Sequence, residues 1–185
     1  MKKNFIFKSG FTLVELLALV VIISAVASFL LPRYKLAKAK AQLLHYGQLV
    51  EEIAKQQEVY YAHTGKYATD VRGLDIPFAD CVMDDSYEFK GNQYRCGKNI
   101  FIDNGVTTNR DPHPLSRGWV SANFCPNANK NFDTCRLKRK AHIVHYFQKA
   151  STEYNGKKAC GYYTPFGKKL CQSVENVVDF YAANE

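Results

Sequence analysis

The sequence has no cysteine before residue 81, no C-x-x-C pair and no histidine at zinc-finger spacing. Structural zinc sites depend on such spacings, so a metal site of this kind is not expected. The chain also lacks the G-x-S-x-G, P-loop and H-E-x-x-H motifs. Sequence support is therefore missing for the hydrolases, nucleotidases and metalloproteases that use them. We expect no catalytic residue, no metal and no cofactor, and an enzyme is the least supported class.

The charge balance is mildly basic. The 185 residues carry a formal net charge of +8, which excludes no fold but favours contact with anionic surfaces. A basic run, RLKRK, spans residues 136–140 and is the candidate for weak binding to DNA or to a surface. A solvated loop is the favoured interpretation of such a run. The length allows one domain in addition to an apolar N-terminal segment.

All six cysteines lie beyond residue 80, downstream of that apolar segment. They are Cys81, Cys96, Cys125, Cys135, Cys160 and Cys171. An even number in this position indicates disulfides formed in an oxidising compartment. The sequence leaves the pairing open, and our working hypothesis joins neighbours: Cys81–Cys96, Cys125–Cys135 and Cys160–Cys171. Closing loops of this size stabilises a small domain by roughly 3 kcal/mol each.

The apolar segment runs from Phe11 to Leu31 and contains a single charged residue, Glu15. At about 1.5 Å per residue, a helix of this length spans a bilayer. No small-residue cleavage site follows the segment, whereas Ser9-Gly10 precedes it. A cut after Gly10 would remove the basic leader and leave the apolar helix on the mature chain. This order predicts a retained membrane helix.

Glu15 raises a question, because an unpaired carboxylate inside lipid is costly and is a functional hypothesis by default. After a cut following Gly10, the new amine of Phe11 would be a cation in the same layer. Glu15 would then pair with the amine of its own chain or with that of a neighbouring subunit. The alternative is a carboxylate that reaches the headgroup level near the helix end. The residues alone leave these interpretations open.

The stretch KSGFTLVELLALVVIISAVASFLLPRY closely resembles the class III signal and N-terminal helix of type IV pilins and type II secretion pseudopilins. The basic leader, Gly10, Phe11 and the following Thr-Leu match, and Glu15 and Pro32 stand where the family has its glutamate and proline. The resemblance covers roughly the first 35 residues. It implies that a prepilin peptidase cuts after Gly10 and that Phe11 is N-methylated. It also implies that Glu15 pairs with the Phe11 amine of an adjacent subunit.

The function implied by this resemblance is structural. We expect the major pilin of a type IV pilus, which self-assembles into a helical homopolymer for adhesion, motility or DNA uptake. The subunit would first reside in the inner membrane as a single-pass protein, in contact with the pilus assembly machinery, and then in an extracellular filament. The alternatives are a type II secretion pseudopilin, or a minor or tip pilin that acts as an adhesin or DNA-binding module.

The predicted organisation has four parts: a leader (1–10), a hydrophobic transmembrane or filament-core helix (11–31), an amphipathic continuation (32–62) and a globular domain (63–185). Pro32 is expected to bend or loosen the helix, and Gly65 to stop it. An apolar stripe at helical spacing predicts one buried face, formed by Leu36, Ala39, Leu43, Tyr46, Val50, Ile53 and Tyr60.

A helix followed by short strands predicts an α+β fold. The resemblance adds a pilin fold, with the C-terminal half of the long helix packed on an antiparallel sheet. We expect a loop at 63–77 anchored by Tyr67, Leu74 and Ile76. Downstream we expect strands within 86–106 that end at Asn104-Gly105, a long disulfide-fastened loop at 107–135, a strand at 141–148 and a hairpin or loop at 160–171. The last residues fit either a helix or a strand.

Overall fold

The computed structural model describes residues 11–76, 81–84, 93–106, 117–126, 132–149, 154–178 and 180–182. The chain is α+β, as predicted. The elements in chain order are α1 (Leu13–Thr64), the 3₁₀ helix η1 (Val71–Gly73), β1 (Cys81–Met83), β2 (Gln93–Cys96), β3 (Ile100–Val106), β4 (Arg117–Phe124), α2 (Phe132–Lys138), β5 (Ala141–Tyr146), β6 (Lys158–Tyr162), α3 (Pro165–Gln172) and β7 (Phe180–Ala182). The chain divides into two compact units, Met1–Ala37 and Lys38–Glu185, and α1 contributes residues to both.

In the first unit, α1 continues through Pro32, although proline removes one backbone donor. The predicted loosening therefore does not interrupt the helix. Two hydroxyl groups in its apolar part donate to the helix backbone, from Ser24 Oγ to the Val20 carbonyl and from Ser28 Oγ to the Ala25 carbonyl, each at 2.7 Å. These bonds satisfy the hydroxyl donors in a segment that has few other polar groups.

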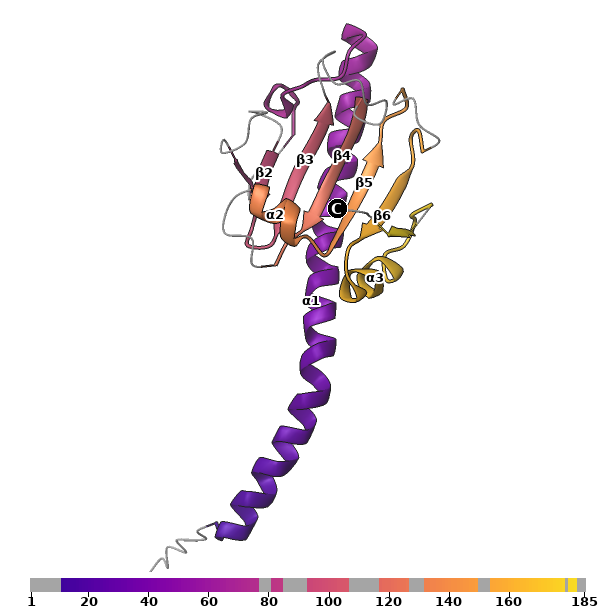
Figure 1. Cartoon of the computed structure of the whole chain (residues 1–185). Coiled ribbons are helices and arrows are strands. Elements are labelled where there is room, and N and C mark those ends of the chain that lie inside the picture. The colour runs from indigo at the N-terminus through magenta and orange to yellow at the C-terminus, as the bar shows by residue number, and fades with distance from the viewer. Residues whose placement is uncertain are drawn as a thin grey trace, which may run out of the picture. The chain divides into compact units, whose positions relative to one another are not determined.

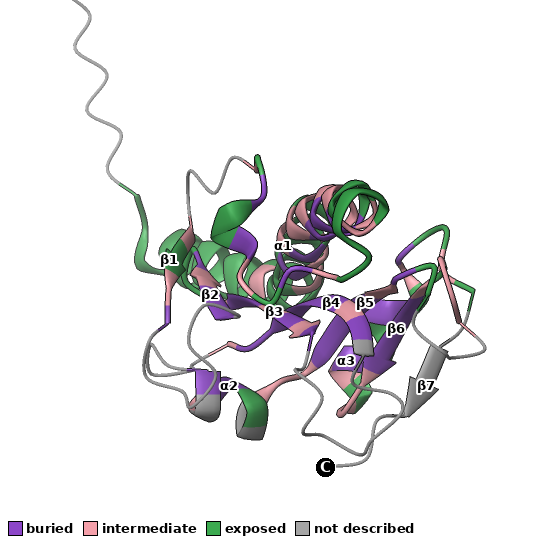
Figure 2. Cartoon of the chain, turned by 90° about the horizontal axis from the view of Figure 1, so that it is seen from above, coloured by how far each residue is buried: buried purple, intermediate pink, exposed green. Residues whose placement is uncertain are grey.

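The second unit is built on a seven-stranded sheet whose spatial order follows the chain, β1 to β7. Figure 1 labels its strands β2 to β6 in this order. Successive strands pair antiparallel up to β6. The last pair, β6 with β7, is parallel, so the expectation of a purely antiparallel sheet is wrong at this edge. Helices α1 and α2 lie on opposite faces of the sheet (Figure 2).

The buried face of α1 in this unit follows the predicted stripe only in part. Ala39, Leu43, Val50 and Ile53 are buried. The stripe then passes through Gln57 instead of Tyr60, which is 37% exposed. Helical spacing brings Gln57 under the same face, one turn after Ile53. The helix ends at Thr64, and Gly65 follows with a φ of +72°, so the predicted stop is confirmed.

Two predictions for the middle of the chain are wrong. Strand β3 does not end at Asn104-Gly105 but runs on to Val106 through a register shift. A Cβ at Gly105 would lie 2.1 Å from Trp119 Cε2, so the missing side chain makes room for the indole ring. Part of the expected loop at 107–135 is the central strand β4 and the start of α2. β4 was not predicted as a strand because it lacks alternation of apolar and polar residues with exposure. The polar residues on its second face, such as Ser121, are buried as well.

The segment 160–171 is a strand followed by a helix, not a hairpin. Thr164 caps α3 by accepting a hydrogen bond from the Gly167 N–H, and Pro165 occupies the first turn. A Cβ on Gly167 would lie 1.7 Å from the Lys140 carbonyl oxygen, so glycine permits this close approach. The undecided C-terminal segment contains a short strand, β7. The strand predicted at 141–148 is confirmed as β5. Residues 86–92 of the predicted 86–106 strands lie outside the described residues.

The three predicted disulfide pairs are confirmed, and each joins neighbouring elements. Cys81 and Cys96 are register partners on β1 and β2. The Cys125–Cys135 bridge joins the end of β4 to α2, within a buried cluster that includes Phe101 and Phe132. The Cys160–Cys171 bridge joins β6 to α3. Two of the three bridges therefore tie the helices α2 and α3 to the sheet.

Candidate assembly site on the apolar helix

Glu15 caps the helix to which it belongs. Its carboxylate oxygen Oε2 accepts hydrogen bonds from the Thr12 backbone N–H and from Thr12 Oγ1, both at 2.8 Å. In return the Glu15 N–H donates to Thr12 Oγ1 at 3.3 Å. This reciprocal arrangement is a capping box, with Thr12 at the N-cap and Glu15 three residues later. The capping box was not predicted, although the T-x-x-E pattern before an apolar run is its signal in the sequence.

The helix that follows exposes its apolar side chains. The described large apolar residues between Phe11 and Leu31 are all exposed, from Leu19 at 42% to Phe11 at 75%. By length and composition, α1 is able to cross a membrane, and within the described residues it is the helix that meets this test. A continuous apolar surface of this kind requires an apolar partner, which is either lipid or other protein chains.

The remaining predicted site residues occupy separate places. Gly10 lies outside the described residues, and Phe11 and Pro32 are exposed on the apolar helix segment. In the single chain, the carboxylate of Glu15 is held by Thr12. An intersubunit partner for this carboxylate remains a prediction.

A buried amide network fastens α1 in the second unit. The Gln57 side chain is fully buried; its Nε2 donates to the Ala68 carbonyl at 2.8 Å, and its Oε1 accepts from the Ala68 N–H at 2.7 Å. Gln57 Nε2 also lies 3.3 Å from Asn104 Oδ1, and Asn104 Nδ2 donates to the same Ala68 carbonyl at 3.2 Å. One side chain therefore joins helix, loop and strand β3. The only sequence signal is a glutamine at a position of the apolar stripe.

The loop after α1 is anchored by Tyr67, as predicted. Its ring packs against Tyr61 and Phe147, with centroids 4.7 Å away in both cases, and its hydroxyl donates to Glu58 Oε1 at 3.1 Å. The hydroxyl also accepts a bond from the Lys149 N–H at 3.0 Å. Burial is the main cause that raises the pKa of Tyr67, so it stays a neutral donor. Leu74 is buried and Ile76 half-buried, which confirms the other two anchors.

On the face of the sheet opposite α1, Asp103 of β3 is a half-buried titratable group. Burial raises its pKa to about 7, against the smaller lowering effects of a hydrogen bond from Gln93 and of the charges of Arg139 and Arg136. The Gln93 Nε2–Asp103 Oδ1 distance is a long 3.4 Å. Burial also lowers the pKa of His142, on β5, to about 3. Both groups are therefore neutral over part of the pH range in which their free counterparts are charged.

A groove with a volume of about 340 Å³ lies beside the second-unit part of α1. Its wall includes Gly47 and Gln48 of α1, Ile143 of β5 and Asn176. An ion pair between Lys158 Nζ and Glu51 Oε1 bridges β6 and α1 at its rim. The groove mixes charges of both signs, so its lining does not define one class of ligand.

Of the three cations in the basic run whose side chains the structure describes, one packs against a neighbouring aromatic ring. The Arg139 guanidinium stacks on the Tyr163 ring, with Cζ 4.3 Å from the centroid, and its Nε atom is buried. Arg136 is exposed on α2. One of the five residues is thus engaged in packing, which favours the solvated-surface interpretation over a DNA contact.

No protein-family model matches the chain, and comparisons with curated proteins and with solved structures find no match.

Proposed function

We propose that this chain is a subunit of a protein filament that resides in a membrane before assembly. The observation that carries the proposal is the apolar helix segment after Phe11, whose large apolar side chains are all exposed and which contains one carboxylate, Glu15. Water is an unfavourable solvent for this surface, at about 25 cal/mol per Å². Before assembly a bilayer covers this apolar surface, and after assembly the same segments of neighbouring copies cover it.

Within this class, we propose the major pilin of a type IV pilus, with a pilin fold in the second unit. The resemblance of residues 8–34 to class III signals supports this assignment, together with the α+β unit fastened by three disulfides. Prepilin peptidase cuts after Gly10 in this proposal, and the mature chain begins at an N-methylated Phe11. The chain acts as a structural protein and not as an enzyme.

Glu15 has two roles in the proposal, in sequence. In the free subunit its carboxylate caps α1 through Thr12. In the filament it pairs with the Phe11 amine of an adjacent copy, which neutralises both charges in an apolar layer. Because one carboxylate has two oxygens and several acceptor sites, a cap through Oε2 leaves the other oxygen for the amine.

The two roles are separable by substitution. Glu15→Gln removes the charge but keeps a carbonyl oxygen that accepts from Thr12, whereas Thr12→Val removes the hydroxyl and keeps the Glu15 charge. We expect Glu15→Gln to abolish filament yield while cleavage after Gly10 proceeds. Thr12→Val is expected to reduce yield only modestly, since a lost cap costs about 1 kcal/mol. Normal filaments from Glu15→Gln would refute the charge pairing.

The assay is mass spectrometry of filaments sheared from the native host, with envelope fractions measured in parallel. Abundant chain that starts at methylated Phe11 in the sheared fraction is the expected result. Cleaved chain confined to the envelope would instead indicate a pseudopilin or a minor pilin. Uncleaved chain that begins at Met1 would overturn the proposal.

A further inference from the structure

We propose that residues 33–35, immediately after the apolar segment, form a collar that binds the headgroups of anionic phospholipids. The collar is defined as Arg33, Tyr34 and Lys35. This inference rests on the proposed membrane-inserted state of the chain, and it adds a lipid class that this state prefers.

The position of the collar follows from helix length. The helical part of the apolar segment, from Leu13 to Leu31, measures about 29 Å, close to the roughly 30 Å thickness of a hydrocarbon core. The collar therefore begins at the level where the headgroups replace the acyl chains. Tyrosine and arginine are the side chains enriched or tolerated at that level, because each has an apolar body and a polar tip.

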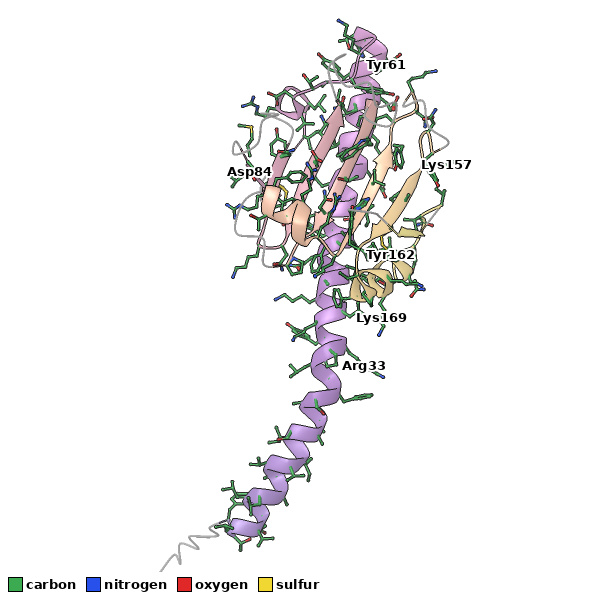
Figure 3. All side chains as sticks on the ribbon, in the orientation of Figure 1. Arg33, Tyr61, Asp84, Lys157, Tyr162 and Lys169 are labelled. Atoms are coloured by element: carbon green, nitrogen blue, oxygen red, sulfur yellow. A yellow bond between two sulfur atoms is a disulfide. The ribbon has the colours of Figure 1, made fainter. Side chains whose placement is uncertain are left out.

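The collar spreads over more than half of the helix circumference instead of forming a stripe. Its three residues are consecutive and exposed, so at about 100° per residue they point to three sides of α1. Arg33 projects from α1 (Figure 3). Its guanidinium Cζ lies 4.2 Å from the centroid of the Phe29 ring, and Tyr34 is 64% exposed. A protein partner would contact one side of the helix. A headgroup layer contacts all sides, and this is why we assign lipid as the partner.

The charge of the collar is not compensated. The sequence has no acidic residue between Glu15 and Glu51, and two more cations, Lys38 and Lys40, follow the collar. The ion pairs of the described residues join Lys55 to Glu52, Arg72 to Asp70 and Lys158 to Glu51, and none includes the collar. Uncompensated cations beside a membrane span attract anionic lipids, at about 1 kcal/mol per charge, which equals about a fivefold preference.

The test uses the full chain in phosphatidylcholine vesicles that contain trace spin-labelled phosphatidylglycerol or spin-labelled phosphatidylcholine. Electron paramagnetic resonance measures the fraction of each label that the protein immobilises. The test variant is Arg33→Gln with Lys35→Gln. The matched control, Lys157→Gln with Lys169→Gln, removes two exposed cations of the second unit (Figure 3). Flotation with the vesicles reports insertion separately.

The wild type and the control are expected to prefer phosphatidylglycerol by about threefold or more, and the test variant to fall towards equal association. Raising the salt concentration should weaken the preference of the wild type. Equal association in an inserted wild type, or an equal loss in the control, would overturn the collar and leave the proposed function intact. Failure of the wild type to float with the vesicles would contradict the membrane state itself, and with it both proposals.

Discussion

The buried amide of Gln57 offers the sharpest test of how α1 is fastened in the second unit. Replacement by leucine keeps a similar volume but removes both hydrogen-bonding atoms. The Ala68 N–H loses its acceptor at 2.7 Å, and Asn104 Oδ1 loses its donor at 3.3 Å. The Ala68 carbonyl keeps the bond from Asn104 Nδ2. Two buried polar groups are therefore left without these partners.

Each such group costs about 1 to 3 kcal/mol when it stays buried and unpaired. The more apolar leucine side chain offsets about 1 kcal/mol of this loss. We expect a net destabilisation of about 2 to 4 kcal/mol. For a unit of this size, each kcal/mol lowers the midpoint of thermal unfolding by about 2 to 4 °C. The expected decrease is therefore about 5 to 15 °C.

The assay is thermal unfolding of the full chain in detergent, with disulfides intact, followed by circular dichroism. Gln48→Leu is the matched control, because Gln48 is exposed on the same helix. The control is expected to change stability by less than about 0.5 kcal/mol. Hydrogen exchange at the Ala68 amide should accelerate in Gln57→Leu only. If Gln57→Leu melts within 1 °C of the wild type and the Ala68 amide stays protected, the network contributes no stability and the reasoning fails.

Two further substitutions test the second unit. The pKa of Asp103 is raised from its ordinary value of 3.8 to about 7, so its contribution to stability is present below pH 4 and is lost as the pH rises through 7. As the pH rises from 4 to 8, the unfolding free energy of Asp103→Asn should therefore increase by about 2 to 4 kcal/mol relative to that of the wild type. A difference between the two unfolding free energies that does not change with pH would contradict this. Gly167→Ala places a Cβ 1.7 Å from the Lys140 carbonyl oxygen and should cost about 2 kcal/mol or more. Gly73→Ala, which meets nothing within 4 Å, is its control, and equal melting temperatures of the two variants would disprove the clash.

The segments that the sequence predicted well are those in which local pattern and burial agree. The long helix, its stop at Gly65 and strand β5 follow from helical spacing and from alternation. The sequence left the cysteine pairing open, and the structure confirms the working hypothesis that neighbouring cysteines pair. The apolar segment with its single carboxylate is equally a property of composition, because its length and hydrophobicity alone set its need for an apolar environment.

The tertiary structure decided what depends on contacts between distant residues. β4 lies centrally in the sheet and buries polar residues on one face, so no alternation marked it. Gln57 replaces an apolar residue in the stripe because Ala68 and Asn104 meet its amide, and neither is visible from the helix sequence. The raised pKa of Asp103 likewise arises from its surroundings. The sequence thus determined the elements that have local periodicity. Which polar side chains are buried was decided by the tertiary structure, because a buried polar group is stable only where packed neighbours supply its hydrogen bonds.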